Sequence, residues 1–290
     1  TRCREVSWAR NVYKRQPQRI VCLSAAPVLA LYEMGAKLVG IPSSRVVSWP
    51  EDLVAATEPV QFSAMSSSDF DYECIVELEA DLVLVGSSST EVGEQIESLG
   101  IPVYYVFAGH TVSYDNIKAQ TEALVKAFSL DEASTAKGEE IMGRFTALEE
   151  RLASVQPTYA DKKAMVLQSS DTANHYIQTE RGTLASMAAM MGFVNVYENE
   201  TSSMAKLDME QALDYNPDLV LCVGGGTAEE HKALMEQAFS ENEAYWNSID
   251  AIKNGNVIYL PVEFCSTAGI HVIDNINELI DCIEAFYAEK

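Results

Sequence analysis

Large apolar residues recur at steps of four, three, four and three positions in the stretch 131–156. This spacing places them on one stripe of an α-helix: Ile141, Phe145, Leu148, Leu152 and Val155. Ser129 and Glu132 have the spacing of a capping box at the helix start, and we expect Pro157 to end the helix. A helix of about 25 residues is roughly 38 Å long, longer than an ordinary globular helix.

The residues before this helix alternate between short apolar runs and amphipathic stretches. We predict strands at 19–24, 37–41, 81–85 and 103–107, and helices at 26–34, 72–78, 91–98 and from Ser113 to Phe128. A loop is predicted from Trp49 to Ser68. Short apolar strands that alternate with helices are typical of a mostly parallel sheet covered on both faces.

The same alternation resumes after the long helix. We predict strands at 163–168, 218–223 and 257–260, and helices at 184–191, 209–215, 229–239 and 274–288. Residues 72–86 also match residues 209–223: in both, a glutamate (Glu73 or Glu210) opens a helix eight residues before the aspartate that begins a strand (Asp81 or Asp218). The pattern predicts two similar α/β lobes joined by one stiff helix.

We therefore divide the chain into a leading arm at 1–17, an N-terminal α/β lobe at 18–129, a linking helix at 130–157 and a C-terminal α/β lobe at 158–290. A length of 290 residues is sufficient for two separate cores. Hydrophobic residues make up 48% of the chain, which is typical of a globular protein.

The formal charge of −23, from 43 acidic and 20 basic residues, disfavours nucleic acid and anionic lipid head groups as partners. It also repels anionic ligands unless a local basic residue overrides the field. No apolar run approaches the length of a membrane span, and no signal peptide is visible at Thr1. The six cysteines contain no C-x-x-C pair, so we expect few or no disulfides and neither a zinc nor a dithiol site.

Ligands of open α/β sheets bind beyond the carboxyl ends of the strands. The predicted loops at those ends are small, hydroxylic or rich in glycine: 24–26, 65–67, 86–88, 169–170 and 224–226. Two such edges facing each other would form a cleft for a small molecule between the lobes. Because one long helix resists large hinge motion, we expect only modest closure on binding.

Taken together, these segments resemble the substrate-binding proteins of ABC importers for iron complexes, haem and cobalamin. This is the class III group, in which two Rossmann-like lobes are joined by a backbone helix. The resemblance covers nearly the whole chain from residue 18, and it is carried by 19–24, 38–41, Glu73 with 80–85, Glu210 with 216–220, and 251–257.

The resemblance implies an extracytoplasmic protein, in the periplasm or on the cell surface as a lipoprotein. It implies an ABC permease dimer as partner, a monomeric receptor without a cofactor of its own, and membrane contact only through a lipid anchor. In this family one glutamate on each lobe docks on basic residues of the permease; by position these are Glu73 and Glu210. The alternative is that each is a favourable acid in the first turn of a helix.

Within this class, the chain resembles in particular the haem-receptor lipoproteins of Gram-positive cell surfaces. Met65 lies where those proteins carry a methionine that ligates haem iron, and a thioether is a known axial ligand. Their partner histidine aligns with 224–226, which here are three glycines, so the pair is incomplete. Either His271 or His110 replaces it, or the ligand is not haem. The candidate ligands are thus haem, a ferric siderophore or a corrinoid, with Met65 and His271 as candidate metal ligands.

Further candidates come from the loops and strand ends. Ser66 and Gly225 belong to the small loops where a ligand can approach the backbone, and Arg45 and Arg181 can pair with carboxylates of a ligand. Apolar walls for a planar macrocycle are expected from Tyr176, Met204 and Phe264, with core packing as the alternative for each. A position of His175 near the cleft with Tyr176 is one alternative, and a position away from it is the other. We expect His231, on a helix beside glutamates, to be solvated.

An enzyme is the main rival class. The chain has no G-x-G-x-x-G, no P-loop and no G-x-S-x-G elbow, so we predict a binding protein without catalysis. A metal chelatase shares the two-lobe plan and is the alternative from a different class; a corrinoid receptor is the alternative within the importer class. A receptor for free manganese or zinc would need several converging ligands, and four scattered histidines disfavour it.

Overall fold

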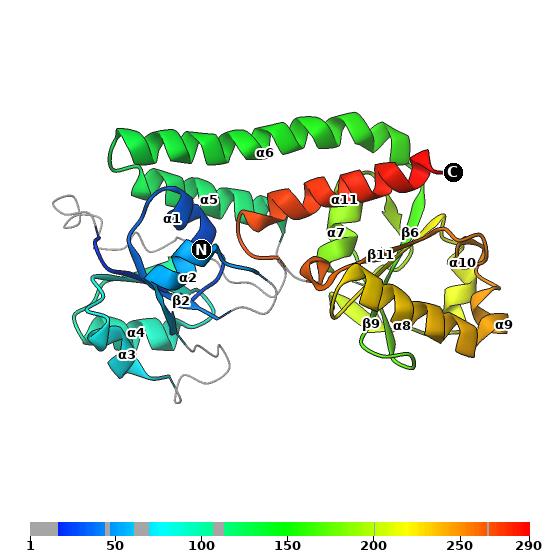
Figure 1. Ribbon diagram of the computed structural model, residues 1–290, viewed down its shortest axis with the longest axis horizontal. Coiled ribbons are helices and arrows are strands. Elements are labelled where there is room, and N and C mark those ends of the chain that lie inside the picture. The colour runs from blue at the N-terminus through cyan, green and yellow to red at the C-terminus, as the bar shows by residue number, and fades with distance from the viewer. Residues whose placement is uncertain (1–16, 44–46, 61–69, 107–112, 200, 266) are drawn as a thin grey trace. The chain divides into compact units, whose positions relative to one another are not determined.

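The computed structural model of the chain describes residues 17–43, 47–60, 70–106, 113–199, 201–265 and 267–290 (Figure 1). The chain forms two compact α/β units. Unit 1 comprises Thr1–Arg144 and Ala268–His271, and unit 2 comprises Phe145–Thr267 and Val272–Lys290. The predicted fold class, two Rossmann-like lobes with mostly parallel sheets and one long helix, is confirmed. The finer boundaries drawn from the sequence stay a prediction.

The sheet of unit 1 is entirely parallel. Its strands are β1 (Ile20–Cys22), β2 (Leu38–Pro42), β3 (Glu58–Val60), β4 (Leu82–Gly86) and β5 (Val103–Val106), in the order β3-β2-β1-β4-β5. The chain winds outward from β1 to β3 and then crosses to β4 and β5 on the other side. The winding reverses between β1 and β4, and the crevice at such a switch point is where ligands of this fold bind.

Helices cover both faces of this sheet (Figure 1). They are α1 (Val28–Glu33), α2 (Glu51–Ala56), α3 (Tyr72–Glu77), α4 (Thr90–Ser98) and α5 (Tyr114–Phe128). Val21 and Val83 pack with Ile75 of α3 and Ile96 of α4 on one face, while the alternate strand residues are buried on the other. The predicted loop from Trp49 to Ser68 is wrong over 51–60, because α2 and β3 lie there. Since α2 buries only Leu53, it has no apolar periodicity to detect.

The sheet of unit 2 is mixed. Its strands are β6 (Lys163–Ser169), β7 (His175–Gln178), β9 (Met204–Lys206), β10 (Leu219–Gly224) and β11 (Val257–Leu260), in the order β11-β10-β6-β7-β9, and β8 (Val194–Asn195) pairs with β6. The strands β11, β10, β6 and β8 run parallel, whereas β7 and β9 are antiparallel additions. The sequence pattern did not predict β7, β8 or β9, because they are short and carry polar residues.

The remaining helices of unit 2 are α7 (Thr183–Met190), α8 (Ala228–Glu241), α9 (Glu243–Trp246), α10 (Asp250–Lys253) and α11 (His271–Ala288), whose first residue belongs to unit 1, with 3₁₀ turns η4 (Gln211–Asp214) and η5 (Val262–Phe264). Met165 and Val220 of the sheet pack with Met235 of α8 and Trp246 of α9 in one core. The helix predicted at 209–215 is only the 3₁₀ turn η4, and α11 begins three residues before the predicted start at 274.

The long helix α6 (Glu132–Tyr159) runs from unit 1 into unit 2. All five apolar residues of its predicted stripe are buried. The predicted cap is wrong: Asp131 Oδ1 accepts the N–H of Ser134 at 2.8 Å, and Ser129 ends α5 instead. Pro157 does not end the helix, which continues to Tyr159. A proline within the last turn removes a single hydrogen bond, so the helix tolerates it there.

The repeat predicted from the sequence is confirmed in the hydrogen bonding of the two units. The N–H of Asp81 donates to the carbonyl of Arg19 (2.9 Å), and that residue's N–H donates back to Asp81 Oδ1 (2.9 Å). In unit 2 the N–H of Asp218 donates to the carbonyl of Lys163 (2.8 Å), whose N–H returns to Asp218 Oδ2 (2.7 Å). Each aspartate thereby joins the start of its strand to the start of the neighbouring one.

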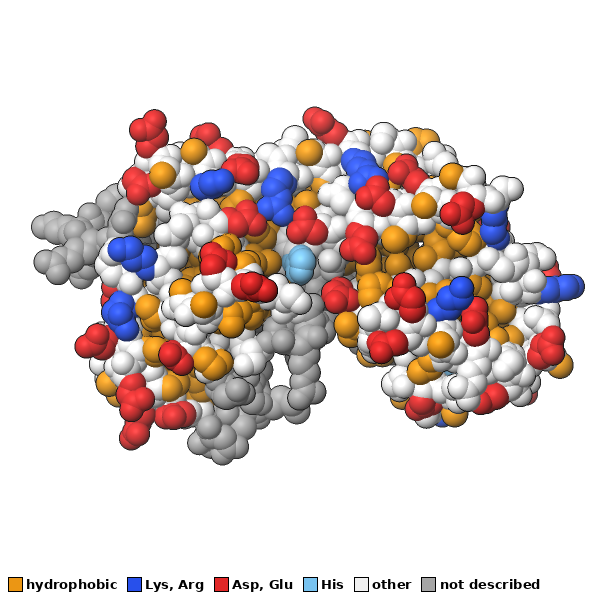
Figure 2. Space-filling model, in the orientation of Figure 1, with side chains coloured by type: hydrophobic (Ala, Val, Ile, Leu, Met, Phe, Trp, Pro, Cys, Tyr) orange, Lys and Arg blue, Asp and Glu red, His pale blue; other side chains and the backbone are white. Residues whose placement is uncertain are grey.

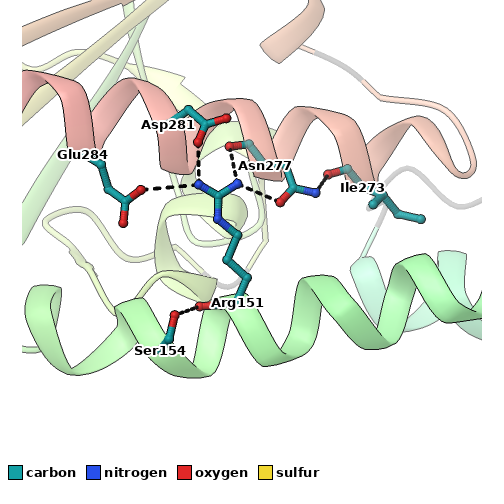
Figure 3. Close-up of polar contacts among 6 residues, drawn as sticks. All are labelled: Arg151, Ser154, Ile273, Asn277, Asp281 and Glu284. Atoms are coloured by element: carbon teal, nitrogen blue, oxygen red, sulfur yellow. Dashed lines mark hydrogen bonds and ion pairs between the residues drawn. The ribbon is translucent and has the colours of Figure 1, made fainter.

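Two arginines on α6 are seven residues apart, and each binds a helix of its own unit. Arg144 Nη1 contacts both carboxylate oxygens of Glu33 on α1, at 3.0 and 2.9 Å. Arg151 binds α11 through the Asn277 Oδ1 at 2.9 Å and through the carboxylates of Asp281 and Glu284 (Figure 3). These ion pairs fix the register between α6 and the helix beside it in each unit.

Candidate functional site

In unit 1 a late segment of the chain lies at the carboxyl end of β1. Gly269 has a φ of +56°, and a Cβ there would lie 1.9 Å from the carbonyl oxygen of Ala26. Only glycine allows this approach of Ala268–His271 to the turn after β1. The same segment ends at His271, the half-buried first residue of α11. The role of His271 as a ligand of metal or cargo stays a prediction.

Ser89 follows β4 at the same edge of the sheet. It is the N-cap residue of α4, but its side chain makes no capping hydrogen bond. The Ser89 hydroxyl is buried and has no partner among the described residues. A buried polar group without a partner costs about 1–3 kcal/mol, so this hydroxyl is a ready donor for a water or a ligand oxygen.

At the carboxyl end of β6 in unit 2, Ser169 pairs with His175 across the strands. Ser169 Oγ lies 2.8 Å from His175 Nδ1, and His175 Nε2 lies 3.2 Å from the carbonyl oxygen of Thr172. Because a carbonyl only accepts, Nε2 carries the hydrogen and Nδ1 accepts the serine hydroxyl. Burial lowers the pKa of His175, against the opposing effect of the Thr172 carbonyl. Ser169 is 2% exposed, so the pair holds the strand ends together and is closed to a substrate.

β10 ends beside this pair at Gly224, the first of three consecutive glycines. A Cβ on Gly224 would lie 2.3 Å from the ring of His231 and 2.4 Å from the carbonyl oxygen of Ser169, whereas a Cβ on Gly225 would meet nothing within 4 Å. Gly225 is exposed at the sheet edge, as a close approach of ligand to backbone requires. The contact of Gly225 with a ligand stays a prediction.

His231, expected to be solvated, is buried with 1% of its surface exposed, so that prediction is wrong. Its ring packs against Gly224, because the glycine leaves the space of a side chain free. Neither ring nitrogen has a partner among the described residues, and burial lowers the pKa of His231. The residue is therefore a neutral imidazole beneath the glycine loop. Its neighbours in sequence gave no sign of this burial.

Tyr176 and Met204, both predicted as apolar walls, are exposed side chains on neighbouring strands. Tyr176 is 38% and Met204 40% exposed, and β7 and β9 pair Tyr176 with Lys206 and Gln178 with Met204. Since β7 runs antiparallel to β6, Tyr176 lies at the carboxyl end of β6, and Met204 lies further from that edge. Arg181 follows the far end of β7, so it does not join Tyr176 at the strand ends.

Phe264, the third predicted wall, is fully buried in η5. It belongs to the core, the alternative considered from the sequence, and offers no ring face to a ligand in this conformation. Next to it, the thiol of Cys265 lies 3.7 Å from the carbonyl oxygen of Gly224, and burial raises the pKa of this thiol to about 11. This cysteine is therefore a protonated packing group and not a reactive thiolate.

Four predicted site residues, Arg45, Met65, Ser66 and His110, lie outside the described residues. Within the described parts of the chain, no group of three or more His, Cys, Asp or Glu side chains is arranged to hold a metal ion. The described cysteines are all free thiols. None of the described helices is both long and apolar enough to cross a membrane.

The two predicted docking glutamates have matching surroundings. Glu73 is exposed in the first turn of α3, and its N–H donates to Asp71 Oδ1 at 3.0 Å. Glu210 is exposed just before η4, and its N–H donates to Asp208 Oδ1 at 2.9 Å. An aspartate two residues upstream thus holds each glutamate, in an equivalent place on each unit.

Comparison with known proteins agrees with this architecture. The sequence model of the periplasmic binding protein family matches residues 20–263. The high-affinity heme uptake system protein IsdE of Staphylococcus aureus is 20% identical over 183 residues, which is 63% of this chain and 61% of that relative. The chain thus matches less than two thirds of the length of this relative.

Two solved structures share the fold. The iron uptake ABC transporter substrate-binding protein PiuA of Streptococcus pneumoniae has a TM-score of 0.69 at 21% identity, covering 91% of this chain and 92% of that one. The periplasmic vitamin B12 binding protein BtuF of Vibrio cholerae has a TM-score of 0.65 at 18% identity, covering 95% and 99%. The chain therefore belongs to the periplasmic binding protein family, and the resemblance to class III substrate-binding proteins inferred from its sequence is confirmed.

Proposed function

We propose that this protein is the extracytoplasmic substrate-binding component of an ABC importer. The observation that carries the proposal is the family match over residues 20–263, which includes the strand ends of both units. The repeated hydrogen bonding at Asp81 and Asp218 supports a receptor built from two kindred units. The protein captures its cargo at the carboxyl ends of its strands and delivers it to the permease without chemical change.

The proposed cargo is an iron complex, either haem or a ferric siderophore. The relative IsdE belongs to a heme uptake system and PiuA to an iron uptake transporter, which supports this choice. An exposed aromatic residue, Tyr176, at the strand ends of unit 2 suits the flat face of a macrocycle. A corrinoid is the second candidate, supported by the fold shared with a vitamin B12 binding protein.

We propose further that Glu73 and Glu210 dock on basic residues of a permease dimer. Both carboxylates are exposed and are held alike by Asp71 and Asp208. Two equivalent carboxylates on two units suit a partner with two-fold symmetry. Figure 2 shows Asp and Glu side chains scattered over the face in view, with fewer Lys and Arg among them. The formal charge of −23 favours a basic docking face on the partner.

A parallel absorbance titration tests the cargo. Haemin, ferric siderophores of the hydroxamate and catecholate types, and cobalamin are added to the protein, and saturation, stoichiometry and melting temperature are measured. We expect one equivalent of an iron complex to bind and to raise the melting temperature, because a ligand that binds only the folded state stabilises it. Saturation by cobalamin alone would favour the corrinoid alternative, and no binding of any complex would contradict the proposal.

Variants at the two candidate metal ligands refine this test. If haem iron is ligated by Met65 and His271, then Met65→Ala and His271→Ala each change the Soret and visible bands of the haemin complex. A silent response of both variants, with haemin still bound, excludes these two residues as axial ligands. Turnover of free porphyrin and metal to a metalloporphyrin would instead support the chelatase alternative.

A further inference from the structure

Lys206 is the last residue of β9 and lies at the carboxyl end of the sheet in unit 2. The sequence pattern did not predict it as a site residue. Lys206 pairs with Tyr176 across β7 and β9. The flanking pair carries the hydrogen bond, from the N–H of Leu207 to the carbonyl of His175 at 2.9 Å. Tyr176 and Lys206 therefore form a non-hydrogen-bonded pair, in which directly opposite side chains are closest and share one face.

Both members of this pair are open to solvent. Tyr176 is 38% exposed and Lys206 is exposed, whereas Ile177 and His175 on the opposite face of β7 are buried. The pair lies one residue from Ser169 and His175, where β6 ends. It therefore lies at the edge of the sheet where ligands of this fold bind.

The side chain of Lys206 has no polar partner among the described residues. It forms no ion pair or hydrogen bond with any described residue, unlike Lys232 of α8, which lies 3.7 Å from Glu236. Asp208, two residues along the chain, instead accepts the backbone N–H groups of Glu210 and Gln211. In a chain with 43 acidic and 20 basic residues, a free ammonium group at a binding edge has a large local effect on an approaching anion.

We propose that Lys206 and Tyr176 form a subsite for a carboxylate carried by a flat or aromatic cargo: the ring of Tyr176 packs on the cargo and the ammonium of Lys206 binds its carboxylate. The inference rests on the proposed receptor function and narrows its cargo to carboxylate-bearing complexes. Haem, with two propionates, meets this requirement, whereas a corrinoid whose side chains are amides does not. Lys206 supplies the local positive charge that the acidic chain needs to accept such an anion.

Matched charge variants test the subsite. The probes are haemin and haemin dimethyl ester, titrated into wild-type protein and into Lys206→Gln, Lys206→Glu and the control Lys232→Gln. We expect Lys206→Gln to weaken haemin about fivefold and Lys206→Glu to weaken it further, because a semi-exposed ion pair contributes up to about 1 kcal/mol. The control should not change haemin binding, and Lys206→Gln should not change binding of the diester, which has no carboxylate.

Each outcome decides a separate point. Equal haemin affinity in wild type and Lys206→Gln, or equal losses for haemin and its diester, overturns the subsite while leaving the receptor function intact. Saturation of the wild type by cobalamin but not by haemin does the same. Failure of the wild type to bind any metal complex overturns the receptor function and the subsite with it. Melting temperatures of all variants, which should agree within a degree or two, exclude misfolding as the cause.

Discussion

Single residues at the edge of the unit 2 sheet combine burial with unsatisfied polar groups. His231 has two ring nitrogens without partners among the described residues, at 1% exposure. Each such group costs about 1–3 kcal/mol if no water reaches it. The residue is therefore a source of instability that the core around Gly224 has to offset, and it is a natural position for stability measurements.

His231→Leu should reduce the dependence of stability on acid. Burial lowers the pKa of His231 in the folded state, so the unfolded chain binds a proton first as the pH falls through about 6.5. The free energy of unfolding is therefore unaffected by this group above about pH 6.5. It decreases as the pH falls from 6.5 to the lower pKa of the folded state, because protonation then favours the unfolded chain. Urea unfolding at pH 7.5 and 5.5 should show a smaller loss in the variant than in wild type. An equal loss would show that His231 does not titrate in this window.

Gly224→Ala should destabilise the protein by about 1–3 kcal/mol, because the new methyl group overlaps the His231 ring and the backbone carbonyl of Ser169. Gly225→Ala is the matched control, since its Cβ meets nothing within 4 Å and its effect should stay within about 0.5 kcal/mol. Urea unfolding measures both. A similar effect of the two substitutions would contradict the packing of His231 described above.

Sequence reasoning was least successful at this scale. Glu229, Glu230 and Lys232 surround His231 with charge, so the local pattern indicates a solvated histidine. Its burial depends on Gly224, which is near only because α8 turns back over β10. The position of Lys206 could not be predicted either, because it belongs to a strand of three residues, which is too short to show an alternation of apolar and polar side chains. Tyr176 was predicted as an apolar wall because of its ring, and the ring is exposed at the strand ends, whereas its contact with a ligand stays a prediction.

Among the elements, α6 is held by arginines rather than by its apolar stripe alone. Arg151 binds Asn277, Asp281 and Glu284 of α11 in one network, with 30% of its side chain exposed (Figure 3). A planar guanidinium fork can satisfy such a set of acceptors at once, and a lysine cannot. The packing of α11 in unit 2 thus has a polar component that depends on one side chain.

Arg151→Ala should lower the free energy of unfolding by about 1 kcal/mol, after allowance for the partial exposure of the side chain. Arg151→Lys should recover less than half of that loss. Lys137→Ala is the control, because Lys137 pairs with Glu140, three residues along α6, and both side chains are exposed. This substitution should leave the melting temperature unchanged. Thermal unfolding compares the three variants. If Lys137→Ala lowered the free energy of unfolding as much as Arg151→Ala, the stabilising role of the Arg151 network would be contradicted.

Prediction of elements succeeded where burial was uniform. β4 and β10 are buried at every position, so their apolar runs gave boundaries within a residue of those observed. It failed where hydrogen bonding rather than apolar pattern makes the element. The strand β7, with the sequence HYIQ, exists because it pairs with β6 and β9, and α6 continues through Pro157 because the loss of one bond in its last turn is small.

At the scale of the whole molecule, the internal repeat is the clearest link between sequence and structure. The match of 72–86 with 209–223 predicted two kindred units, and both use an aspartate to join neighbouring strands. The repeat is imperfect, because α3 is an α-helix and its counterpart η4 is a 3₁₀ turn. The fold class and the internal repeat could therefore be predicted from the sequence, although α2, β3, β7, β8 and β9 could not. The cargo could not be predicted either, since binding residues of such folds lie on loops, where the sequence shows no periodic pattern.

Charge reversal at both repeated glutamates should abolish delivery but not capture. In Glu73→Lys with Glu210→Lys, we expect unchanged cargo affinity and loss of stimulated ATP hydrolysis by the proposed permease partner in proteoliposomes, because the two proposed docking contacts become repulsive. Each single reversal should give an intermediate loss. Glu77→Lys with Asp214→Lys, exposed residues in the same two elements, is the control for net charge. If the control pair lowered ATP hydrolysis equally, the loss would come from the change in net charge and not from the proposed docking contacts of Glu73 and Glu210.

The passage of Ala268–His271 into unit 1 has a consequence for how the protein is made. Unit 1 is not complete when residue 144 leaves the ribosome, because the strip that seats Gly269 against Ala26 is synthesised more than a hundred residues later. The first 144 residues therefore lack a part of their own unit until Ala268–His271 have been synthesised. If the chain is exported unfolded, all of unit 1 is available when folding begins, and the turn after β1 is not left exposed while the rest of the chain is made.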